Sequence, residues 1–263
     1  MHPILFQFGS FTLHTYGVLV ATGILLGLWL SRQRAARYGL DPDRVWNLGI
    51  YLVLAALLGA KVWYVFANWE YYSANPREIV SMATMQAAGV WYGGMLSALA
   101  VIVFYVRSTK LPLLPLTDAY FAPVSLGHAF GRLGCFTAGC CWGKPTAVAW
   151  GITFTKPYAN MVVGVPLGVR LHPTQLYEAT AEFAIFGILM WLTARQRFSG
   201  QIFAAYAMLY GAVRLTNEFF RGDPGRGDFF GTGLSHMQAV SIGLMILGAW
   251  LWFTGPSRPL KKK

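Results

Sequence analysis

Two arginines lie in segments that are otherwise largely apolar. Arg132 falls in GHAFGRLGCF, and Arg214 falls in YGAVRLTNEFF. A charged side chain at the centre of a bilayer costs about 2.5–3.5 kcal/mol on insertion scales, so such a residue usually faces a polar cavity and has a function. Because the planar guanidinium fork binds two phosphate oxygens at once, the pair indicates a phosphate site. A phospholipid head group is the phosphate most available at this depth.

The structural alternative is that each arginine forms an ion pair that joins two helices. Glu178, Glu182 and Glu218 are the carboxylates available for such pairs. Glu218 follows Arg214 by four residues and precedes Arg221 by three, so on a helix it can pair with either arginine. In both interpretations the helical face that carries these charges should point into a bundle.

Other polar side chains accompany the arginines. On a helix, Tyr210 lies one turn before Arg214, and His128 lies one turn before Arg132. The segment LHPTQLYE opens a further apolar run, where Pro173 fits the start of a helix. Further hydrogen-bonding side chains near the span ends are Tyr16, His172, Gln175 and Glu178.

The composition indicates that a membrane surrounds these residues. Of the 263 residues 56% are hydrophobic and 12% are charged, and the mean hydropathy is +0.46. Soluble domains carry about twice that share of charge, and apolar runs of about 17–25 residues are typical of spanning helices. We therefore expect an all-α integral membrane protein, a single transmembrane domain over residues 1–263. About seven transmembrane helices are expected, at Thr12–Leu30, Val45–Asn68, Val90–Val106, Leu116–Phe136, Thr174–Ala194, Ile202–Phe220 and His236–Phe253.

The basic residues predict the orientation of the chain. With seven spans, the basic clusters near the span ends all fall on one side, which should be cytoplasmic. They comprise Arg32, Arg34, Arg37, Arg44, Arg107, Lys110, Arg195, Arg197, Arg258 and Lys261 to Lys263. The N-terminus should then lie outside and the C-terminus in the cytoplasm. This topology and attraction to anionic lipid account for the net charge of +11, so no nucleic-acid partner is expected.

Two segments next to the spans need separate interpretation. The first span lacks a basic n-region and an A-x-A site, so it should stay in the mature protein. Residues 137–173 are rich in Gly, Pro and aromatic residues, too polar to span and too apolar to be freely solvated. We expect these residues to form an outer arm along the membrane surface between the fourth and fifth spans.

The three cysteines of the chain all fall in GCFTAGCC, and they allow several interpretations. The spacing C-x4-C-C lacks the paired C-x2-C that is typical of zinc sites. A disulfide between Cys135 and Cys140 is conceivable near an oxidising outer face. The remaining alternatives are small buried residues in a tight turn and a role for Cys135 as a nucleophile.

Several motifs together resemble the prolipoprotein diacylglyceryl transferases of bacteria. In chain order they are HTYGV, WYGGM, GRLGCFTAGCCWG, HPTQLYE, YGAVRLTNEFFRGDP and SHMQAVSIGLM. The resemblance covers most of the chain. It implies a seven-span enzyme of the bacterial cytoplasmic (inner) membrane. That enzyme transfers the diacylglyceryl group of phosphatidylglycerol to the lipobox cysteine of a preprolipoprotein.

The resemblance also assigns partners and residues. The implied partners are phosphatidylglycerol, preprolipoprotein signal peptides and membrane lipids. Arg132 and Arg214 match the two arginines that matter most in the family. Six further residues fall on family-like positions, namely Tyr16, Gln175, Glu178, Tyr210, Glu218 and Arg221. Together with His128 and His172 they are the candidates for substrate binding. Three positions differ from the family pattern. Tyr92 stands where a histidine usually precedes Gly-Gly, and Cys135 and Cys140 stand where the family has an asparagine and a glutamate.

The implied reaction needs a thiolate, because the deprotonated sulfur is the nucleophile and a free thiol has a pKa of about 8.5. The thiolate attacks the glycerol carbon that carries phosphate, and Arg132 and Arg214 stabilise the charge that leaves on the phosphate. This chemistry requires no metal or cofactor. Tyr92, His128 and His172 are the candidates for the base, with Tyr92 at the catalytic position of the family histidine.

Other functions fit some of the same residues. A paralogue could act on another acceptor, and paired arginines in a membrane would also suit a non-catalytic protein that binds or carries lipids or anions. The sequence has no detectable internal repeat of the kind that transporters often show. A membrane redox protein built on the cysteines would need a cofactor motif, and the sequence has none.

Overall fold

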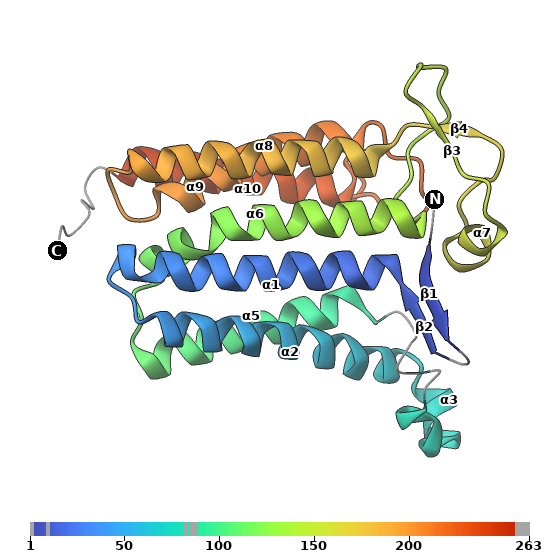
Figure 1. The fold of residues 1–263 in the computed structure, drawn as a ribbon, viewed down its shortest axis with the longest axis horizontal. Coiled ribbons are helices and arrows are strands. Elements are labelled where there is room, and N and C mark those ends of the chain that lie inside the picture. Colours follow the sequence, from blue (N-terminus) through green and yellow to red (C-terminus); the bar gives the residue numbers. More distant parts are fainter. Residues whose placement is uncertain (1–2, 9–10, 82–83, 85–88, 256–263) are drawn as a thin grey trace. The chain divides into compact units, whose positions relative to one another are not determined.

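The computed structural model describes residues 3–8, 11–81, 84 and 89–255, and these are mostly helical (Figure 1). The elements are β1 (Ile4–Phe8), β2 (Phe11–His14), α1 (Thr15–Ala35), η1 (Ala36–Tyr38), α2 (Pro42–Ala67), α3 (Trp69–Ala74), η2 (Pro76–Val80), α5 (Trp91–Thr109), α6 (Leu113–Ala138), β3 (Ile152–Thr153), α7 (Pro157–Val163), β4 (Arg170–Leu171), α8 (Thr174–Ala194), α9 (Gln201–Glu218) and α10 (His236–Thr254). The short strands pair as β1 with β2 and β3 with β4, both antiparallel, and the sequence did not predict them.

Five helices of the described part are long and apolar enough to cross a membrane. They are Thr15–Tyr38, Pro42–Ala67, Tyr92–Thr109, Thr174–Ala194 and His236–Thr254. The expectation of a helical membrane protein is therefore confirmed at this level. The other two predicted spans correspond to α6 and α9, which have 26 and 18 residues.

The chain divides into two compact units, Met1–Ser31 with Thr117–Lys263, and Arg32–Leu116. In the second unit α2 packs closely on α5 through small residues. A Cβ at Gly94 would lie 2.8 Å from the carbonyl oxygen of Ala56, and one at Gly93 would collide with the side chain of Trp63. The missing side chains therefore permit the close approach of these two helices.

The first unit contains all but one of the predicted site residues. In this unit α8, α9 and α10 lie side by side, and α1 runs along α6 (Figure 1). A Cβ on Gly23 of α1 would lie 2.8 Å from the carbonyl oxygen of Gly127 in α6, so these two helices are in close backbone contact. A core cluster joins α6, α8 and α9 and consists of Ala122, Ile185, Leu189, Ile202, Ala205 and Tyr206.

A buried carboxylate at the start of α6 fixes the start of α9. Asp118 accepts the backbone N–H groups of Gly200, Ile202 and Phe203 at 2.6, 2.9 and 3.2 Å. It also accepts the Gln196 side-chain amide at 2.6 Å. The first N–H groups of a helix have no partner within the helix, and a negative charge there also favours the helix dipole. The two helices consequently begin at the same end and run in the same direction.

The segment between α6 and α8 is compact and has its own small core. It contains β3, β4 and α7, and its buried apolar side chains are Trp142, Phe154, Ala159, Val165 and Leu171. The backbone N–H of Gly168 donates to the carbonyl of Phe154 at 3.0 Å. The predicted arm is thus a folded structure, and its position along a membrane surface stays a prediction.

The Asp118 cap generates a stability prediction. Asp118→Ala removes the acceptor of four hydrogen-bond donors, so we expect the unfolding free energy to fall by about 3 kcal/mol. Asp118→Asn retains one oxygen and should lose less. Unfolding of the detergent-solubilised protein, followed by circular dichroism during denaturant titration, measures the change.

The matched control is Asp43→Ala, because the Asp43 and Arg32 side chains pair at 2.9 Å while both stay more than half exposed to solvent, at 74% and 52%. Exposed pairs of this kind contribute at most about 1 kcal/mol. Equal losses for Asp118→Ala and Asp43→Ala would contradict the capping role.

Candidate phosphate and thiol site

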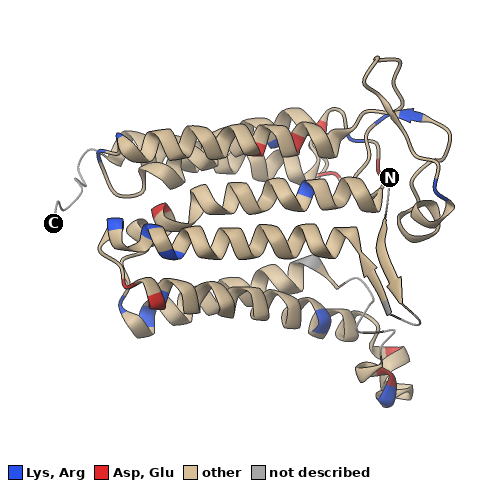
Figure 2. Ribbon diagram, in the orientation of Figure 1, with Lys and Arg blue, Asp and Glu red and all other residues tan. Residues whose placement is uncertain are grey.

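Charged positions are sparse along the helices of the first unit and gather where α6, α8 and α9 approach the folded segment (Figure 2). The centre of this group is Glu178 of α8, which is 1% exposed. Its Oε1 lies 2.8 Å from Nη2 of Arg132 in α6. Its Oε2 accepts the side-chain amide of Asn217 in α9 at 2.9 Å. One carboxylate thus connects three helices.

His128 lies one turn before Arg132 and contacts two carboxylates. Its Nδ1 is 2.7 Å from Oε1 of Glu182, and its Nε2 is 3.6 Å from Oε1 of Glu178. Ser125 donates to both the carboxylate and the backbone carbonyl of Glu182. These contacts hold the imidazole between α6 and α8, so His128 belongs to the same polar cluster as Arg132.

Arg132 and Arg214 lie at matching levels of α6 and α9. One turn before them, the rings of His128 and Tyr210 meet edge to face, with centroids 5.3 Å apart. Because the two helices run in the same direction, the next turn of each brings its arginine to the same level. Tyr210 lies within electrostatic range of both guanidinium groups. The site therefore combines two cations from different helices.

Arg214 and Glu218 form the ion pair that their spacing allows. Arg214 Nη1 lies 2.7 Å from Glu218 Oε2, and both side chains are almost fully buried. Glu218 also accepts the guanidinium of Arg226 and, at 2.7 Å, the hydroxyl of Ser235, the N-cap of α10. Glu218 consequently positions Arg214 and ties the end of α9 to the start of α10.

Arg221 has a different partner from the one its spacing suggested. Its Nε and Nη2 both donate to the carboxylate of Asp223 at 2.6 Å. Burial alone would lower the pKa of Arg221, but the hydrogen bonds and charge of Asp223 outweigh it and raise that pKa. The alternative of a pair with Glu218 is wrong, because α9 ends at Glu218 and helical spacing does not continue to position 221.

Gln175 and His172 hold the folded segment next to this cluster. Gln175 is buried, and its side-chain amide donates to the carbonyl of Cys140 at 2.6 Å. The Nδ1 of His172 lies 3.0 Å from the hydroxyl of Tyr177, which also accepts the indole N–H of Trp150 at 2.7 Å. Gln175 therefore holds the turn that carries Cys140 and Cys141, the cysteine turn, whereas His172 packs against the rings of Tyr177 and Phe220.

The two remaining tyrosines differ in position. Tyr16 is 44% exposed in the first turn of α1, and its ring would lie 3.1 Å from a Cβ placed on Gly134 of α6. It also lies within electrostatic range of the three cysteines and Arg132. Tyr92, at the start of α5, is 55% exposed and belongs to the second unit. The structure thus brings Tyr16 to the cluster, and the catalytic role of Tyr92 stays a prediction.

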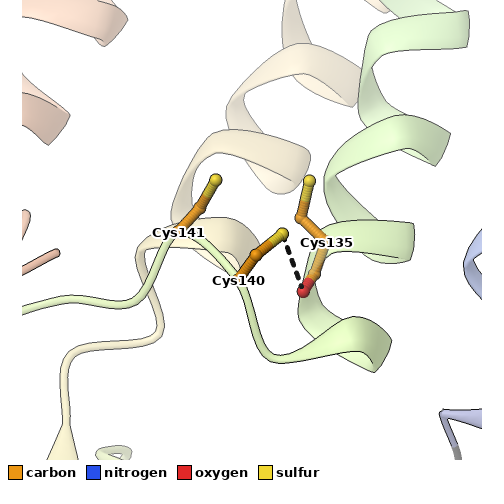
Figure 3. Close-up of side chains that lie close together, drawn as sticks. All are labelled: Cys135, Cys140 and Cys141. Atoms are coloured by element: carbon orange, nitrogen blue, oxygen red, sulfur yellow. Dashed lines mark hydrogen bonds between the residues drawn. The ribbon is translucent and has the colours of Figure 1, made fainter. Parts of the chain in front are cut away.

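The three cysteines form a compact group at the end of α6 and in the turn that follows (Figure 3). All three are free thiols in the structure, not the conceivable Cys135–Cys140 disulfide. Within the described residues they form the one group of His, Cys, Asp or Glu side chains that could share a metal ion. The Cys140 thiol donates to the backbone carbonyl of Cys135, with the sulfur and oxygen atoms 3.7 Å apart (Figure 3).

Two of the polar residues that sequence reasoning missed are Asn217 and Arg226. Asn217 bonds Glu178, and Arg226 bonds Glu218. Asn217 follows Arg214 by three residues and therefore lies on the same helical face, a signal that was available. Arg226 lies beyond the end of α9 in a glycine-containing loop, where no local pattern indicates its partner.

An apolar groove lies beside the polar cluster. It has a volume of about 400 Å³ between α8 and α9 and is lined by Tyr177, Ala181, Ala212, Val213, Thr216, Asn217 and Phe220. Asn217 is the residue that connects the groove to the cluster, since its amide donates to Glu178. A long apolar chain and an anionic group of one ligand could therefore bind in adjacent places.

Comparison with known families identifies the chain. The sequence profile described as prolipoprotein diacylglyceryl transferase matches residues 3–254. The chain belongs to this family. The resemblance carried by the short motifs is thereby confirmed over nearly the full length.

Similar proteins support the same assignment. A phosphatidylglycerol–prolipoprotein diacylglyceryl transferase of Clostridium tetani is 32% identical over 96% of this chain and 97% of its own length. A protein of the same name from Bordetella parapertussis is 32% identical and covers 97% of both chains. Another from Solidesulfovibrio magneticus is 32% identical over 95% of this chain and 92% of its own.

In this prolipoprotein diacylglyceryl transferase family member, the Gln175 contact predicts the accessibility of the cysteine turn. Gln175→Leu keeps the side-chain size and removes the donor to the Cys140 carbonyl. A hydrogen bond of about 1 kcal/mol corresponds to a roughly fivefold change in the opening equilibrium. Maleimide labelling of the turn cysteines should therefore become several-fold faster, as measured by mass spectrometry.

The control is Gln33→Leu, which alters an exposed residue of the second unit. Its labelling rate should equal that of the unaltered protein. Identical rates in all three proteins would show that Gln175 does not hold the turn.

Proposed function

We propose that this protein transfers the diacylglyceryl group of phosphatidylglycerol to the thiol of the lipobox cysteine in preprolipoproteins, the first step of bacterial lipoprotein maturation. Membership of the family and the names of the similar proteins support this activity. The observation that carries the proposal is the pair of almost buried arginines, Arg132 and Arg214, at one level of two neighbouring helices. Such a pair suits the phosphate of a lipid head group.

Arg132 and Arg214 bind the phosphate and stabilise its departure in this mechanism. Each is oriented by a carboxylate, Glu178 or Glu218, at a single nitrogen of the guanidinium group. The Nε of Arg132 is buried and has no hydrogen-bond partner among the described residues. Buried donors are normally satisfied, so a phosphate oxygen is a suitable partner for this atom. The charge that develops on the leaving phosphate then meets two fixed cations.

The neighbouring polar residues complete the substrate site. Glu178 and Glu218 orient the arginines, and the groove between α8 and α9 accommodates an acyl chain. Tyr210 and His128 lie one turn from the arginines, where the glycerol part of the lipid would follow its phosphate. The further proposed substrate-binding residues are Tyr16, His172, Gln175 and Arg221. The candidates for deprotonating the acceptor thiol are Tyr92, His128 and His172.

The placement in the membrane is part of the proposal. Counting α6 and α9 with the five apolar helices gives seven spans in a bacterial cytoplasmic (inner) membrane. The basic residues near the span ends then lie in the cytoplasm with the C-terminus, and the N-terminus and the folded arm at residues 137–173 lie outside. Phosphatidylglycerol and the signal peptides of preprolipoproteins would both reach the site from the outer leaflet.

Transfer by the purified protein tests the proposed function. The full chain in detergent is mixed with phosphatidylglycerol and a synthetic lipobox peptide, and mass spectrometry detects the diacylglyceryl thioether. Glycerol phosphate should appear in equal amount. Release of glycerol phosphate without a lipidated peptide would favour another acceptor, and absence of both products would contradict the proposal. Complementation of a bacterium depleted of its own transferase tests the same activity in cells.

Substitution of the arginines tests the phosphate contact. Arg132→Lys and Arg214→Lys keep the charge and remove the planar fork, so each should lower the transfer rate by about 100-fold. Arg107→Lys, an exposed substitution in the second unit, is the control and should leave the rate unchanged. All variants should insert normally, as judged by their amount in the membrane. Near-normal transfer in both arginine variants would exclude the phosphate clamp.

Reporter fusions test the proposed orientation. A reporter active only in the cytoplasm should be active when fused after Lys263, because the basic clusters keep that end inside. The same reporter inserted after Asn160 of the arm should be inactive. The reverse pattern in well-expressed fusions would overturn the orientation.

A further inference from the structure

The cysteine group has a geometry that the proposed phosphate chemistry does not use. The sulfur atoms of Cys135, Cys140 and Cys141 all lie within 4.8 Å of one another, at the corners of a triangle (Figure 3). Tetrahedral zinc–thiolate bonds of about 2.3 Å separate neighbouring sulfur atoms by about 3.8 Å. A closure of at most about 1 Å would therefore let the three sulfur atoms hold one zinc ion.

The turn is held in place by residues outside the group. Gln175 and Thr174, at the start of α8, donate to the carbonyls of Cys140 and Cys141 at 2.6 and 2.7 Å. Cys141 has a φ of 62°, a conformation that is uncommon for a residue with a side chain and that occurs often at functional sites. Contacts of this kind orient the ligands of a metal site before the ion binds.

We propose that Cys135, Cys140 and Cys141 bind a zinc ion as thiolates, and that the acceptor cysteine of the substrate occupies its fourth position. The inference rests on the proposed transferase function, because that function supplies the acceptor thiol. Three protein ligands with one open position are the arrangement of catalytic zinc sites. The three cysteines are partly exposed, so a fourth ligand can approach them. The spacing C-x4-C-C is not typical of zinc sites, but the folded turn brings the three sulfur atoms together.

The proposed step balances without a redox partner. The acceptor thiol loses its proton to water when its sulfur binds zinc, since a coordinating thiol is deprotonated. The sulfur then forms a bond to the glycerol carbon, and the bond between that carbon and the phosphate oxygen breaks. The electron pair leaves with the phosphate as glycerol phosphate. The neutral thioether is a weaker ligand than the thiolate and departs, which returns the zinc ion to three ligands.

The charges around the turn suit this complex. Two positive charges on zinc and four thiolates give a net anion, which keeps the bound sulfur nucleophilic and requires nearby cations. Arg221 and Arg132 lie within electrostatic range of Cys141. Arg132 also belongs to the proposed phosphate contact, so the thiolate and the leaving group would meet beside one guanidinium. No separate side chain then needs to act as the base.

Metal binding tests the first part of the inference. The purified full chain, treated with a chelator and then given one equivalent of Zn²⁺, should retain about one ion per chain by elemental analysis. Cys135→Ser, Cys140→Ser and Cys141→Ser should each weaken retention by 10-fold or more. Thr137→Ala, which changes a residue of the same helix end outside the sulfur group, is the control and should retain the ion. Failure of the unaltered protein to bind Zn²⁺ overturns the inference even if a variant misfolds.

Ligation of the acceptor tests the second part. X-ray absorption of the zinc-loaded protein should show a gain of one sulfur ligand when a lipobox peptide is added. A peptide with serine in place of its cysteine should give no change, and unchanged sulfur coordination with both peptides overturns the proposal. Co²⁺ in place of Zn²⁺ provides a second signal, through its thiolate charge-transfer absorption.

Comparison with transfer activity separates this inference from the proposed function. Removal of zinc from the unaltered protein should abolish transfer from phosphatidylglycerol, and Zn²⁺ should restore it. Full transfer by the metal-free protein would overturn the zinc site and leave the proposed function standing. Zinc binding with ligation of the peptide but without transfer would support the thiol site and overturn the proposed function.

Discussion

The buried carboxylate of Glu178 fixes the three helices that carry the site. It contacts Arg132 of α6 at 2.8 Å and Asn217 of α9 at 2.9 Å. A carboxylate is tolerated in an apolar interior only when it is paired and hydrogen-bonded, so these helices must meet at its level. Loss of one partner from a buried pair costs about 3–5 kcal/mol, because a charge stays behind without compensation. The position of Arg132, and with it the proposed phosphate contact, depends on this ion pair.

Local spacing predicted the helical parts of this arrangement well. The predicted span Thr174–Ala194 coincides with α8, and the pair of Arg214 with Glu218 follows from one helical turn. The ion-pair interpretation of the arginines is confirmed, since each guanidinium has a carboxylate partner, and the phosphate interpretation stays a proposal that uses the remaining nitrogens. Helical spacing predicts the Arg214–Glu218 contact because both residues belong to the same helix. The same spacing suggested Glu218 as a partner for Arg221, which instead pairs with Asp223 because α9 ends at Glu218.

Contacts between distant segments were beyond the reach of the sequence pattern. The Asp118 cap joins positions 82 to 85 residues apart, and the contacts of Thr174 and Gln175 with the cysteine turn span 33 and 35 residues. The sulfur group forms only because these contacts hold the turn and Cys141 adopts a left-handed conformation. The spacing C-x4-C-C contains neither fact, so it could not distinguish a metal site from small buried residues.

The frame of the cysteine turn is made mostly of main-chain bonds. Gly143 donates to the carbonyl of His172 at 3.1 Å, Lys144 donates to that of Phe220 at 2.8 Å, and Gly222 donates to that of Trp142 at 3.1 Å. A frame of this kind tolerates exchange of the side chains that project from it. The backbone of the turn can therefore keep its conformation while the side chains that it positions differ. The asparagine and glutamate that the resemblance implies and the cysteines at positions 135 and 140 would then be alternative side chains on one backbone frame.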